Sequence, residues 1–527
     1  MAVKVLFLII FFTVMILIGV STRKHAHNVE GFVLGGRTAG PWLTAFGYGT
    51  SYFSAVVFVG YAGQFGYKYG ISATWAGIGN AMIGSLLAWR ILGRRTRVMT
   101  KHLDSRTMPD FFGKRFESRS LRLAAALISF TFLIPYTSSV YNGLSRLFRM
   151  AFDIPYGICV IVMAALTCVY VILGGYMATV VNDFVQGIIM LFGISAVIFA
   201  VLHNNGGFIQ ALTTLSEYDS DLAVTSGMHG AFTSFFGPDP LNLLGVVILT
   251  SLGTWGLPQM VGKFYAIRDE KAIKAGTIIS TLFALVVAGG SYFLGGFARL
   301  YSGNAAILNP DGSVAYDAIV PTMLSGLPNI LIGIVIVLVL SASMSTLSSL
   351  VLTSSSSVTL DLIAQINKKM NEKKQLITMR ALLVVFIVLS VIMALNPPTF
   401  IAQLMGYSWG ALAGSFLAPF FYGLYWKKTT KASVWACFIS GVGITLSNMA
   451  FHYIASPINA GAITMAAGLV IVPVVSLLTP KMDKKTVDDI FECYNATVTV
   501  EKRYSLEEDE TEEEISEEDE ENRENAV

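Results

Sequence analysis

The sequence predicts an all-α polytopic membrane protein with about 13 transmembrane helices, arranged as an inverted repeat of five plus five helices. Of its 527 residues, 54% are hydrophobic and 13% are charged, and the mean hydropathy is +0.63. Apolar stretches of about 20 residues, the length that crosses a ~30 Å hydrocarbon core, recur along almost the whole chain. Two of these stretches are interrupted at their centres by small and polar residues.

Each element is expected from its own apolar run. The first run, from Val5 to Val20, is long for a signal peptide and no small-residue cleavage site follows it, so we expect a retained helix. The expected spans are 3–21, 41–64, 72–92, 122–147, 154–173, 183–202, 241–261, 273–298, 328–362, 378–395, 399–425, 432–453 and 460–478.

The cysteines and histidines exclude several classes of protein. The six histidines are scattered, and the four cysteines have no paired spacing (Cys159, Cys168, Cys437 and Cys493). We therefore expect neither a disulfide framework nor a metal site built from these residues. No cofactor, no enzymatic activity and no nucleic-acid partner are expected. The expected partners are a small solute, sodium and the lipid bilayer.

Lysine and arginine in the loops predict the orientation. Four segments are basic (94–122, 263–274, 368–374 and 427–431), and three contain no Lys or Arg (203–240, 300–327 and 452–459). Thirteen spans place the two sets on opposite sides. We therefore expect the N-terminus outside the cell membrane and the C-terminus in the cytoplasm.

The chain divides into a transmembrane domain, 1–480, and a tail, 481–527. Between Glu507 and Glu524 the tail holds 13 acidic residues and one Arg, so without them 35 basic and 21 acidic residues remain, a net charge of +14. Such a composition favours a disordered cytoplasmic segment over a regulatory or docking segment.

Two helices are expected to be discontinuous. The second span has Gly47, Gly49, Thr50 and Ser51 at its centre. The seventh has two glycines followed by Pro258, which lacks a backbone donor. Unwound backbone at this depth persists where it lines a cavity or a bound ion. Ordinary packing through small residues is the alternative for either helix alone. Because the interruptions are five spans apart, we expect two repeats, about 41–202 and 241–425, with the binding site between them.

The ninth span carries hydroxyl groups inside an apolar helix. At 100° per residue, Ala342, Ser345, Ser348 and Ser349 share one face, and Thr346 borders it. Neutral oxygens suit a weakly held monovalent cation such as sodium. Alternatively, these small residues only allow helices to approach and bond to their own carbonyls.

Asp183 is expected at the start of the sixth span, at the cytoplasmic membrane boundary, with Gln186 one turn further on. Either it is a first-turn acid favoured by the helix dipole or it belongs to an ion route. Its position alone does not separate these roles.

Several motifs in order resemble the sodium:solute symporter family over about residues 1–480. The residues that carry this resemblance are Phe32, Leu34, Gly35, Gly36 and Arg37; Gly174, Gly175, Ala178, Asp183 and Gln186; Met344 to Ser348; and Tyr407 to Ala411. Within the family the chain is most similar to the sodium/proline branch, through 132–136, Leu147, Phe148 and 252–258. The resemblance implies a leucine-transporter-like fold.

The resemblance also implies binding residues. Sodium would be held by the carbonyls of Thr50, Phe53 and Ala342 and the hydroxyls of Ser345 and Thr346. A second sodium, or a sodium relay, would use Asp183, Ser348 and Ser349. The solute would lie near Ser54, Tyr136, Trp255 and Pro258.

The chain departs from this branch at two positions. Proline carriers usually have an acid in the second helix, where this chain has Tyr52, and a Trp in the seventh, where it has Thr250. The region that matches the carboxylate-binding Arg of sialic acid carriers has no Arg, and Arg146 lies nearer the membrane edge. The two departures count against proline itself, and the missing Arg counts against a sialic acid. From the resemblance as a whole, the expected solute is an amino acid such as proline, or a small carboxylate.

The expected function is sodium-coupled symport of this solute into the cytoplasm by alternating access. By linkage, sodium and solute would each tighten the other's binding. The alternatives are proton-coupled symport, which the scarcity of titratable residues at mid-depth disfavours, and a membrane solute sensor. A passive channel would need a ring of identical or charged pore residues, and the broken helices, which occur once each, argue against such a ring.

Overall fold

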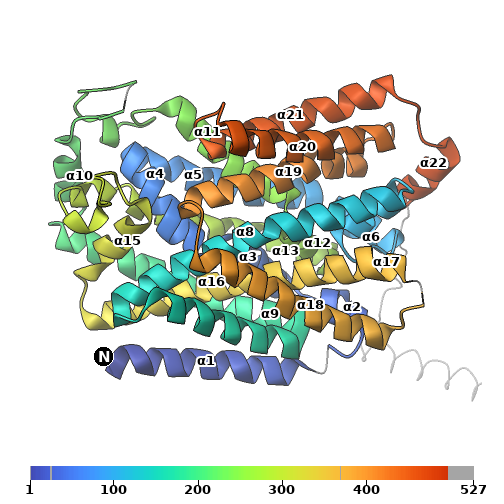
Figure 1. The fold of residues 1–527 in the computed structure, drawn as a ribbon, viewed down its shortest axis with the longest axis horizontal. Coiled ribbons are helices and arrows are strands. Elements are labelled where there is room, and N and C mark those ends of the chain that lie inside the picture. The colour runs from blue at the N-terminus through green and yellow to red at the C-terminus, as the bar shows by residue number, and fades with distance from the viewer. Residues whose placement is uncertain (1, 24–25, 223, 368, 496–527) are drawn as a thin grey trace, which may run out of the picture.

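The computed structural model describes residues 2–23, 26–222, 224–367 and 369–495. Every regular element in these ranges is a helix, and two isolated bridges join Ala39 to Ile267 and Leu308 to Val314. Most long helices run in roughly the same direction, along the long axis of the molecule (Figure 1). The predicted all-α fold class is confirmed.

The helices of the first half alternate between long spans and short connecting pieces. They are α1 (Ala2–Thr22), α2 (Val29–Leu34), α3 (Pro41–Tyr52), α4 (Ala62–Tyr69), α5 (Thr74–Gly79), α6 (Arg94–His102), α7 (Met108–Arg115), α8 (Arg119–Phe152), α9 (Tyr156–Asn204) and α10 (Phe208–Ser216). Three π-helical segments adjoin these short helices: Val56–Tyr61 precedes α4, Asn80–Leu87 follows α5, and Trp89–Gly93 precedes α6.

The second half follows the same pattern. Its helices are α11 (Pro240–Leu252), α12 (Pro258–Ala266), α13 (Glu270–Ala284), α14 (Gly290–Gly295), α15 (Tyr316–Ser325), α16 (Asn329–Ser357), α17 (Ala364–Ile366), α18 (Glu372–Leu395), α19 (Ile401–Tyr425), α20 (Lys431–Phe451), α21 (Pro457–Leu478) and α22 (Lys484–Glu492).

Both expected interruptions are present. In the first, α3 ends at Tyr52, Phe53 is extended (φ −81°, ψ 120°), and the helix resumes at Val56. In the second, a 3-10 turn, Gly253–Gly256, leads to an extended Leu257 (φ −88°, ψ 121°), and α12 starts at Pro258. The two halves of this second helix are bent by 46°. The two discontinuous helices that the sequence predicts are therefore confirmed.

The number of spans stays a prediction. Among the described residues, nine helices are long and apolar enough to cross a membrane, or ten when the bent pair α11–α12 is one span. Within α9, Gly175 has φ 56° and ψ −146°, a kink that separates two helices, 156–174 and 176–204. These correspond to the fifth and sixth expected spans, and the sixth begins at 176 rather than at 183.

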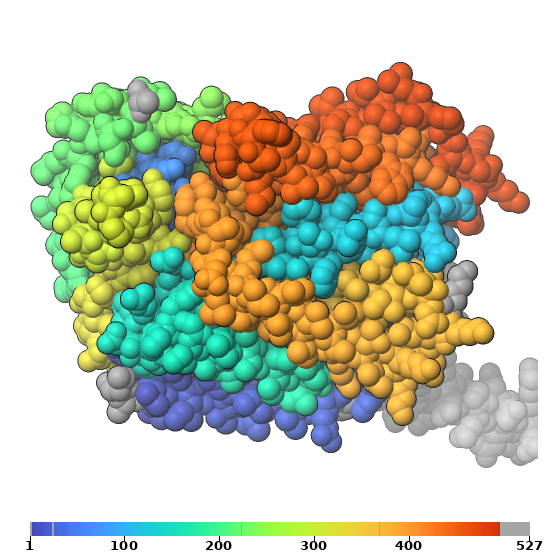
Figure 2. All heavy atoms as spheres, viewed as in Figure 1, coloured from blue at the N-terminus to red at the C-terminus, as the bar shows by residue number. Residues whose placement is uncertain are grey.

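Helix α16 lies at the centre of the molecule. In its most apolar window 78% of the residues are buried, against 22% for α1, 33% for α20 and 39% for α21. Figure 2 shows the peripheral position of these last three: α1 forms the lower edge, and the C-terminal helices form the upper edge. The hydroxyl-bearing helix is thus enclosed by the others.

The segments with and without Lys and Arg lie at opposite ends. Helices α6, α17 and α22 lie at one end, and α10 and α15 lie at the other (Figure 1). The basic segments 94–122, 369–374 and 427–431 belong to the first end, and the segments 203–222, 224–240 and 300–327, which lack Lys and Arg, belong to the second. This separation agrees with the expected charge asymmetry.

Helix α22 differs from the expectation of a disordered tail beyond residue 480. The buried Arg115 guanidinium lies 4.9 Å from the Phe491 ring centroid. Arg95 lies 4.5 Å from the Tyr494 ring, and Lys427 pairs with Asp488 at 2.7 Å. Cation–π contacts and an ion pair thus hold α22 against the basic end. The acidic residues 507–524 lie outside the described residues.

Glycines set the closest approach between the two halves. A Cβ at Gly66 in α4 would lie 1.8 Å from the carbonyl oxygen of Gly295 in α14. A Cβ at Gly295 would lie 2.1 Å from the Ala62 oxygen. These obstacles are backbone atoms, which cannot rotate away. The contact between α4 and α14 therefore requires glycine at both positions.

We expect Gly66→Ala to lower the free energy of unfolding by about 1–3 kcal/mol, because overpacking forces backbone shifts. Thermal unfolding of the purified protein in detergent measures the effect. Gly443→Ala in α20 is the matched control, because a Cβ there meets nothing within 4 Å. Equal melting temperatures for the two variants would contradict this packing.

Candidate functional site

The first interruption exposes carbonyl groups at the end of α3. A helix leaves its last four carbonyls without intrahelical partners. Here α3 ends at Tyr52, so the oxygens of Thr50 and Ser51 in the last turn, with that of Phe53 just beyond it, are available to other groups. All three residues are buried. A buried carbonyl without a partner is costly, so this turn requires donors or a cation from elsewhere in the fold.

Thr346 of α16 meets these carbonyls. Its hydroxyl oxygen lies 3.1 Å from the Ala342 oxygen, 3.2 Å from that of Ser51, 3.3 Å from that of Phe53 and 3.4 Å from that of Thr50. One hydroxyl proton serves one acceptor well, so the cluster has more oxygen lone pairs than hydrogens. Such a set of neutral oxygens suits a small hard cation.

Ser345 joins the same cluster. Its hydroxyl donates to the Thr50 hydroxyl at 2.8 Å, and both side chains are fully buried. The five residues expected around sodium (Thr50, Phe53, Ala342, Ser345 and Thr346) are therefore brought together from α3, its break and α16. None of these five residues carries an acidic side chain, although Ser345 also interacts with the Asp183 carboxylate. Neutral oxygens suit a monovalent cation better than a divalent one.

Small residues permit this approach. A Cβ at Gly187 of α9 would lie 2.3 Å from the Phe46 ring and 3.1 Å from the Thr50 methyl group. A Cβ at Gly193 would lie 3.1 Å from Leu338 of α16. Helix α9 thus packs tightly against both α3 and α16. It fixes the distance across which the carbonyls and hydroxyls meet.

Asp183 lies inside the fold, contrary to the expected membrane boundary. It is fully buried in α9, and Lys263 Nζ of α12 donates to its Oδ2 at 3.2 Å. Lys263 was counted with the basic loop in the sequence, but its side chain is only 3% exposed. The expectation of a solvated carboxylate at an exposed boundary is therefore wrong. Lys263 is a site residue that the sequence reasoning missed.

The serines expected near Asp183 have other partners. Ser349 and Ser51 hydroxyls lie 2.9 Å apart, and Ser348 donates to the Ser345 carbonyl at 2.8 Å. Asp183 Oδ1 is buried without a hydrogen-bond partner. Both hydroxyls are thus engaged with α3 or with their own helix.

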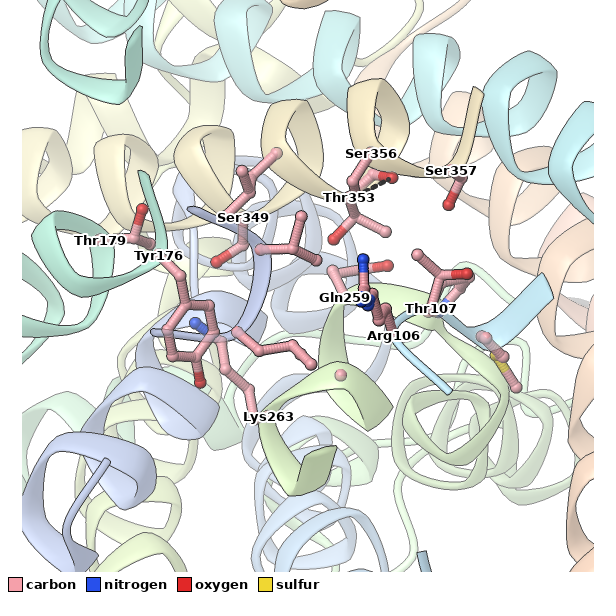
Figure 3. A pocket seen from close by; sticks show the side chains of 16 residues that line it. Arg106, Thr107, Tyr176, Thr179, Gln259, Lys263, Ser349, Thr353, Ser356 and Ser357 are labelled. Atoms are coloured by element: carbon pink, nitrogen blue, oxygen red, sulfur yellow. Dashed lines mark hydrogen bonds between the residues drawn. The ribbon is translucent and has the colours of Figure 1, made fainter. Parts of the chain in front are cut away.

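A narrow cavity of about 50 Å³ leads toward this region. That volume holds a few water molecules, since one needs about 10–15 Å³ on this measure. Lys263 and Tyr176 lie together at one end, with Ser349 and Thr179 nearby, and Arg106 and Thr107 lie at the other end (Figure 3). Arg106 and Thr107 belong to the basic segment 94–122, so the cavity opens toward the basic end.

The four residues expected around the solute have different surroundings. Tyr136 of α8 packs against Trp409, with ring centroids 5.8 Å apart. Trp255 lies 6.3 Å from Phe421 and donates to the Ile83 carbonyl at 3.0 Å. Pro258 lines the narrow cavity. Ser54 lies in the first break, where its hydroxyl accepts from the Val56 amide at 3.2 Å.

Trp409 and Asn80 also connect the two interruptions. The ring centroid of Trp409 lies 5.8 Å from that of Tyr52, the last residue of α3, and a Cβ at Gly253 in the second break would lie 3.0 Å from the Trp409 ring. Asn80 donates to the Tyr52 hydroxyl at 2.5 Å and accepts from Ser251 of α11 at 3.1 Å. The motif Tyr407–Ala411 marked the region of Trp409 in the sequence, whereas Asn80 carried no sequence signal.

Comparison with known proteins agrees with this geometry. Residues 32–441 match the sodium:solute symporter family. An osmoregulated proline transporter of Bacillus subtilis, OpuE, is 30% identical over 83% of this chain and 87% of its own. A sodium/proline symporter of Staphylococcus aureus is 27% identical over 90% of this chain and 92% of its own.

A solved structure shares the fold. The structure of a Na⁺-coupled sialic acid symporter matches with a TM-score of 0.71 at 16% identity, covering 92% of this chain and 99% of that one. At this identity the likeness concerns the fold, which is the predicted leucine-transporter-like, all-α fold with two discontinuous helices. The family match covers most of the chain and its members are transporters rather than enzymes. The chain belongs to the sodium:solute symporter family and is a multi-pass membrane protein.

Proposed function

We propose that this symporter carries a small organic solute into the cytoplasm together with sodium, which binds between α3 and α16. The observation that carries this proposal is the convergence of four carbonyl oxygens on the Thr346 hydroxyl, at 3.1–3.4 Å. Thr50, Phe53 and Ala342 would contribute carbonyls, and Ser345 and Thr346 hydroxyls. In broken-helix transporters, half-helix C-terminal carbonyls coordinate sodium in this way.

Sodium at this position would couple the ion to the movement of the broken helix. The ion would neutralise the partial negative charge at the end of α3 and join that end to α16. Its release would leave buried carbonyls with too few donors, which favours a change in the break. By linkage, a solute that binds the ion-stabilised conformation tightens sodium binding equally.

The proposed direction is inward across the cell membrane. We place the basic end with α6, α17 and α22 in the cytoplasm, following the positive-inside rule. The N-terminus is then outside and the acidic tail inside. Each sodium ion gains about 2.3 kcal/mol per 100 mV from the membrane potential, in addition to its concentration gradient. This free energy would drive the solute uphill by alternating access.

We propose an amino acid such as proline, or a small carboxylate, as the solute. The similar proteins from Bacillus subtilis and Staphylococcus aureus are named as proline carriers. Each break is also followed by a new half-helix inside the helical domain, which starts at Val56 in the first case and at Pro258 in the second. The amide groups at such N-termini attract a carboxylate. The faces of Tyr136 and Trp409 would then hold the apolar or cationic part.

Proton-coupled symport is the second candidate, and the buried Asp183–Lys263 pair favours it. Both side chains are ionisable and lie inside the helical domain, and Lys263 lines a water-sized cavity. Proton-carrying transporters use acids in such positions. A sodium-free proton gradient distinguishes this candidate from sodium coupling.

A panel of labelled solutes in proteoliposomes tests the function as a whole. It contains proline, other small amino acids and small carboxylates, each measured with an inward sodium gradient, a potassium gradient and a proton gradient. We expect one solute to accumulate under the sodium gradient and not under the potassium or proton gradient. Accumulation driven by the proton gradient in sodium-free buffer would support the second candidate and contradict sodium coupling.

Thr346→Ala is expected to raise the sodium concentration for half-maximal uptake by about tenfold or more. A hydrogen bond or similar contact to a charged group contributes about 1.5–3 kcal/mol, and 1.4 kcal/mol corresponds to a factor of ten. The measurement is initial uptake against sodium concentration at fixed solute.

Thr445→Ala in α20 is the matched control. Its hydroxyl also donates to the carbonyl four residues earlier, at 2.9 Å, and it is buried, but it lies outside both repeats. An unchanged sodium dependence in Thr346→Ala, at normal expression, would remove Thr346 from the sodium site.

A further inference from the structure

The buried ion pair between Asp183 and Lys263 bears on how many sodium ions accompany each solute. Its side chains are 0% and 3% exposed, which makes it the least exposed ion pair formed by the residues that the structure describes. It joins α9 to α12, the half-helix that follows the second break. The pair also packs against α3, because a Cβ at Gly47 would lie 3.3 Å from Asp183 Oδ2 and 3.4 Å from Lys263 Nζ.

We propose that Lys263 is a tethered cation that takes the charge position beside Asp183 which a second sodium ion would otherwise fill, so that one sodium ion is coupled to each solute. This inference rests on the proposed sodium coupling through the Thr346 cluster. It assigns Lys263 the role of setting the stoichiometry, and it removes Asp183 from the list of independent ion ligands.

The charge balance supports this assignment. Asp183 and Lys263 together are neutral, so another cation beside them would leave a net positive charge inside the fold. Burying an uncompensated charge costs several kcal/mol. Without the ammonium group, the carboxylate would itself be uncompensated, and a sodium ion would restore neutrality. Lys263 and a second sodium are therefore alternatives at this position.

The neighbouring hydroxyl groups support it as well. Ser348 donates to the Ser345 carbonyl and Ser349 is hydrogen-bonded to Ser51, but both hydroxyl oxygens keep lone pairs that can bind a sodium ion. Ser345 also interacts with the Asp183 carboxylate, whose buried Oδ1 makes no regular hydrogen bond. Without the ammonium, both carboxylate oxygens and these hydroxyls would be available to a second sodium ion.

A water-sized cavity reaches the Lys263 member of the pair from the basic end. Lys263, Tyr176, Thr179 and Ser349 all line the narrow cavity (Figure 3). The Lys263 Nζ also lies 5.4 Å from the Tyr176 ring centroid, a cation–π contact that helps to hold the ammonium in place. Shortening or neutralising Lys263 would thus open a hydrated route to an unpaired carboxylate.

The test is the sodium-to-solute ratio, obtained from reversal potentials in proteoliposomes with known sodium and solute gradients. We expect a ratio of one for the unmodified protein. Lys263→Met should give a ratio of two with a Hill coefficient above one for sodium. The double variant Lys263→Met with Asp183→Asn should return to one, and Lys263→Arg should stay at one.

Arg146→Met is the matched control. Arg146 pairs with Asp317 at 3.6 Å near the opposite end, so its removal also deprives a buried acid of a cation. It should leave the ratio at one. A ratio of two in the unmodified protein, or of one in Lys263→Met because a proton replaces the ammonium, overturns the inference.

Equilibrium binding of ²²Na⁺ to purified protein covers the case in which Lys263→Met does not transport. The expected values are one ion per unmodified chain and two per Lys263→Met chain, with Lys263→Gln as a second variant. Two ions on the unmodified chain overturn the inference alone. Absence of any sodium binding or sodium-driven uptake in the unmodified protein instead contradicts the proposed function.

Discussion

Helix α3 ends inside the helical domain, and the oxygens that it leaves there constrain the rest of the structure. Thr50 and Phe53 present carbonyls where no bulk water can solvate them, so the neighbouring helices must supply compensation. Helix α16 supplies the hydroxyl groups of Ser345 and Thr346 to these carbonyls, which is consistent with its position at the centre of the fold. Gly187 and Gly193 let α9 press against α3 and α16 at the required distance. A site of neutral oxygens holds a cation weakly enough for release, which is what repeated transport requires.

The second constraint is that charged groups inside this domain must be neutralised. The Thr346 cluster is built from neutral groups, whereas Asp183 is neutralised by Lys263 a short distance along the same packed helices. With this arrangement, a sodium ion could bind and leave at the neutral Thr346 cluster while the charge of Asp183 stays neutralised by Lys263. The ion pair also connects α9 to α12, so a movement of the second broken helix changes the surroundings of the carboxylate. In the proposed mechanism, α3 would couple ion binding to the movement of the second broken helix, because α3 packs against both α16 and α12.

Sequence patterns predicted the parts of this arrangement that are local. Glycines within 47–49 and within 253–256 are visible without a fold, so the two breaks could be named in advance. The hydroxyl groups within 341–349 marked α16, and the family resemblance supplied the residues proposed for sodium. Lys263 could not be named in advance, because it is the first residue of the basic segment 263–274, which the sequence places in a loop, and only tertiary packing reveals its burial. The two glycines at 174–175 also mark the division between the fifth and sixth spans, because Gly175 leaves helical geometry there. Asn80 bridges Tyr52 and Ser251 by contacts distant in sequence, which no local pattern encodes.

Amide hydrogen exchange of the purified protein in sodium and in potassium, at equal ionic strength, tests most directly whether sodium joins α3 to α16. Sodium binding to the carbonyls of Thr50, Phe53 and Ala342 stabilises the helix ends that carry them. The account predicts slower exchange in sodium for residues 50–58 and 342–350, with α20 and α21 unchanged. Identical exchange of both segments in the two salts, at sodium concentrations that saturate uptake, would contradict it.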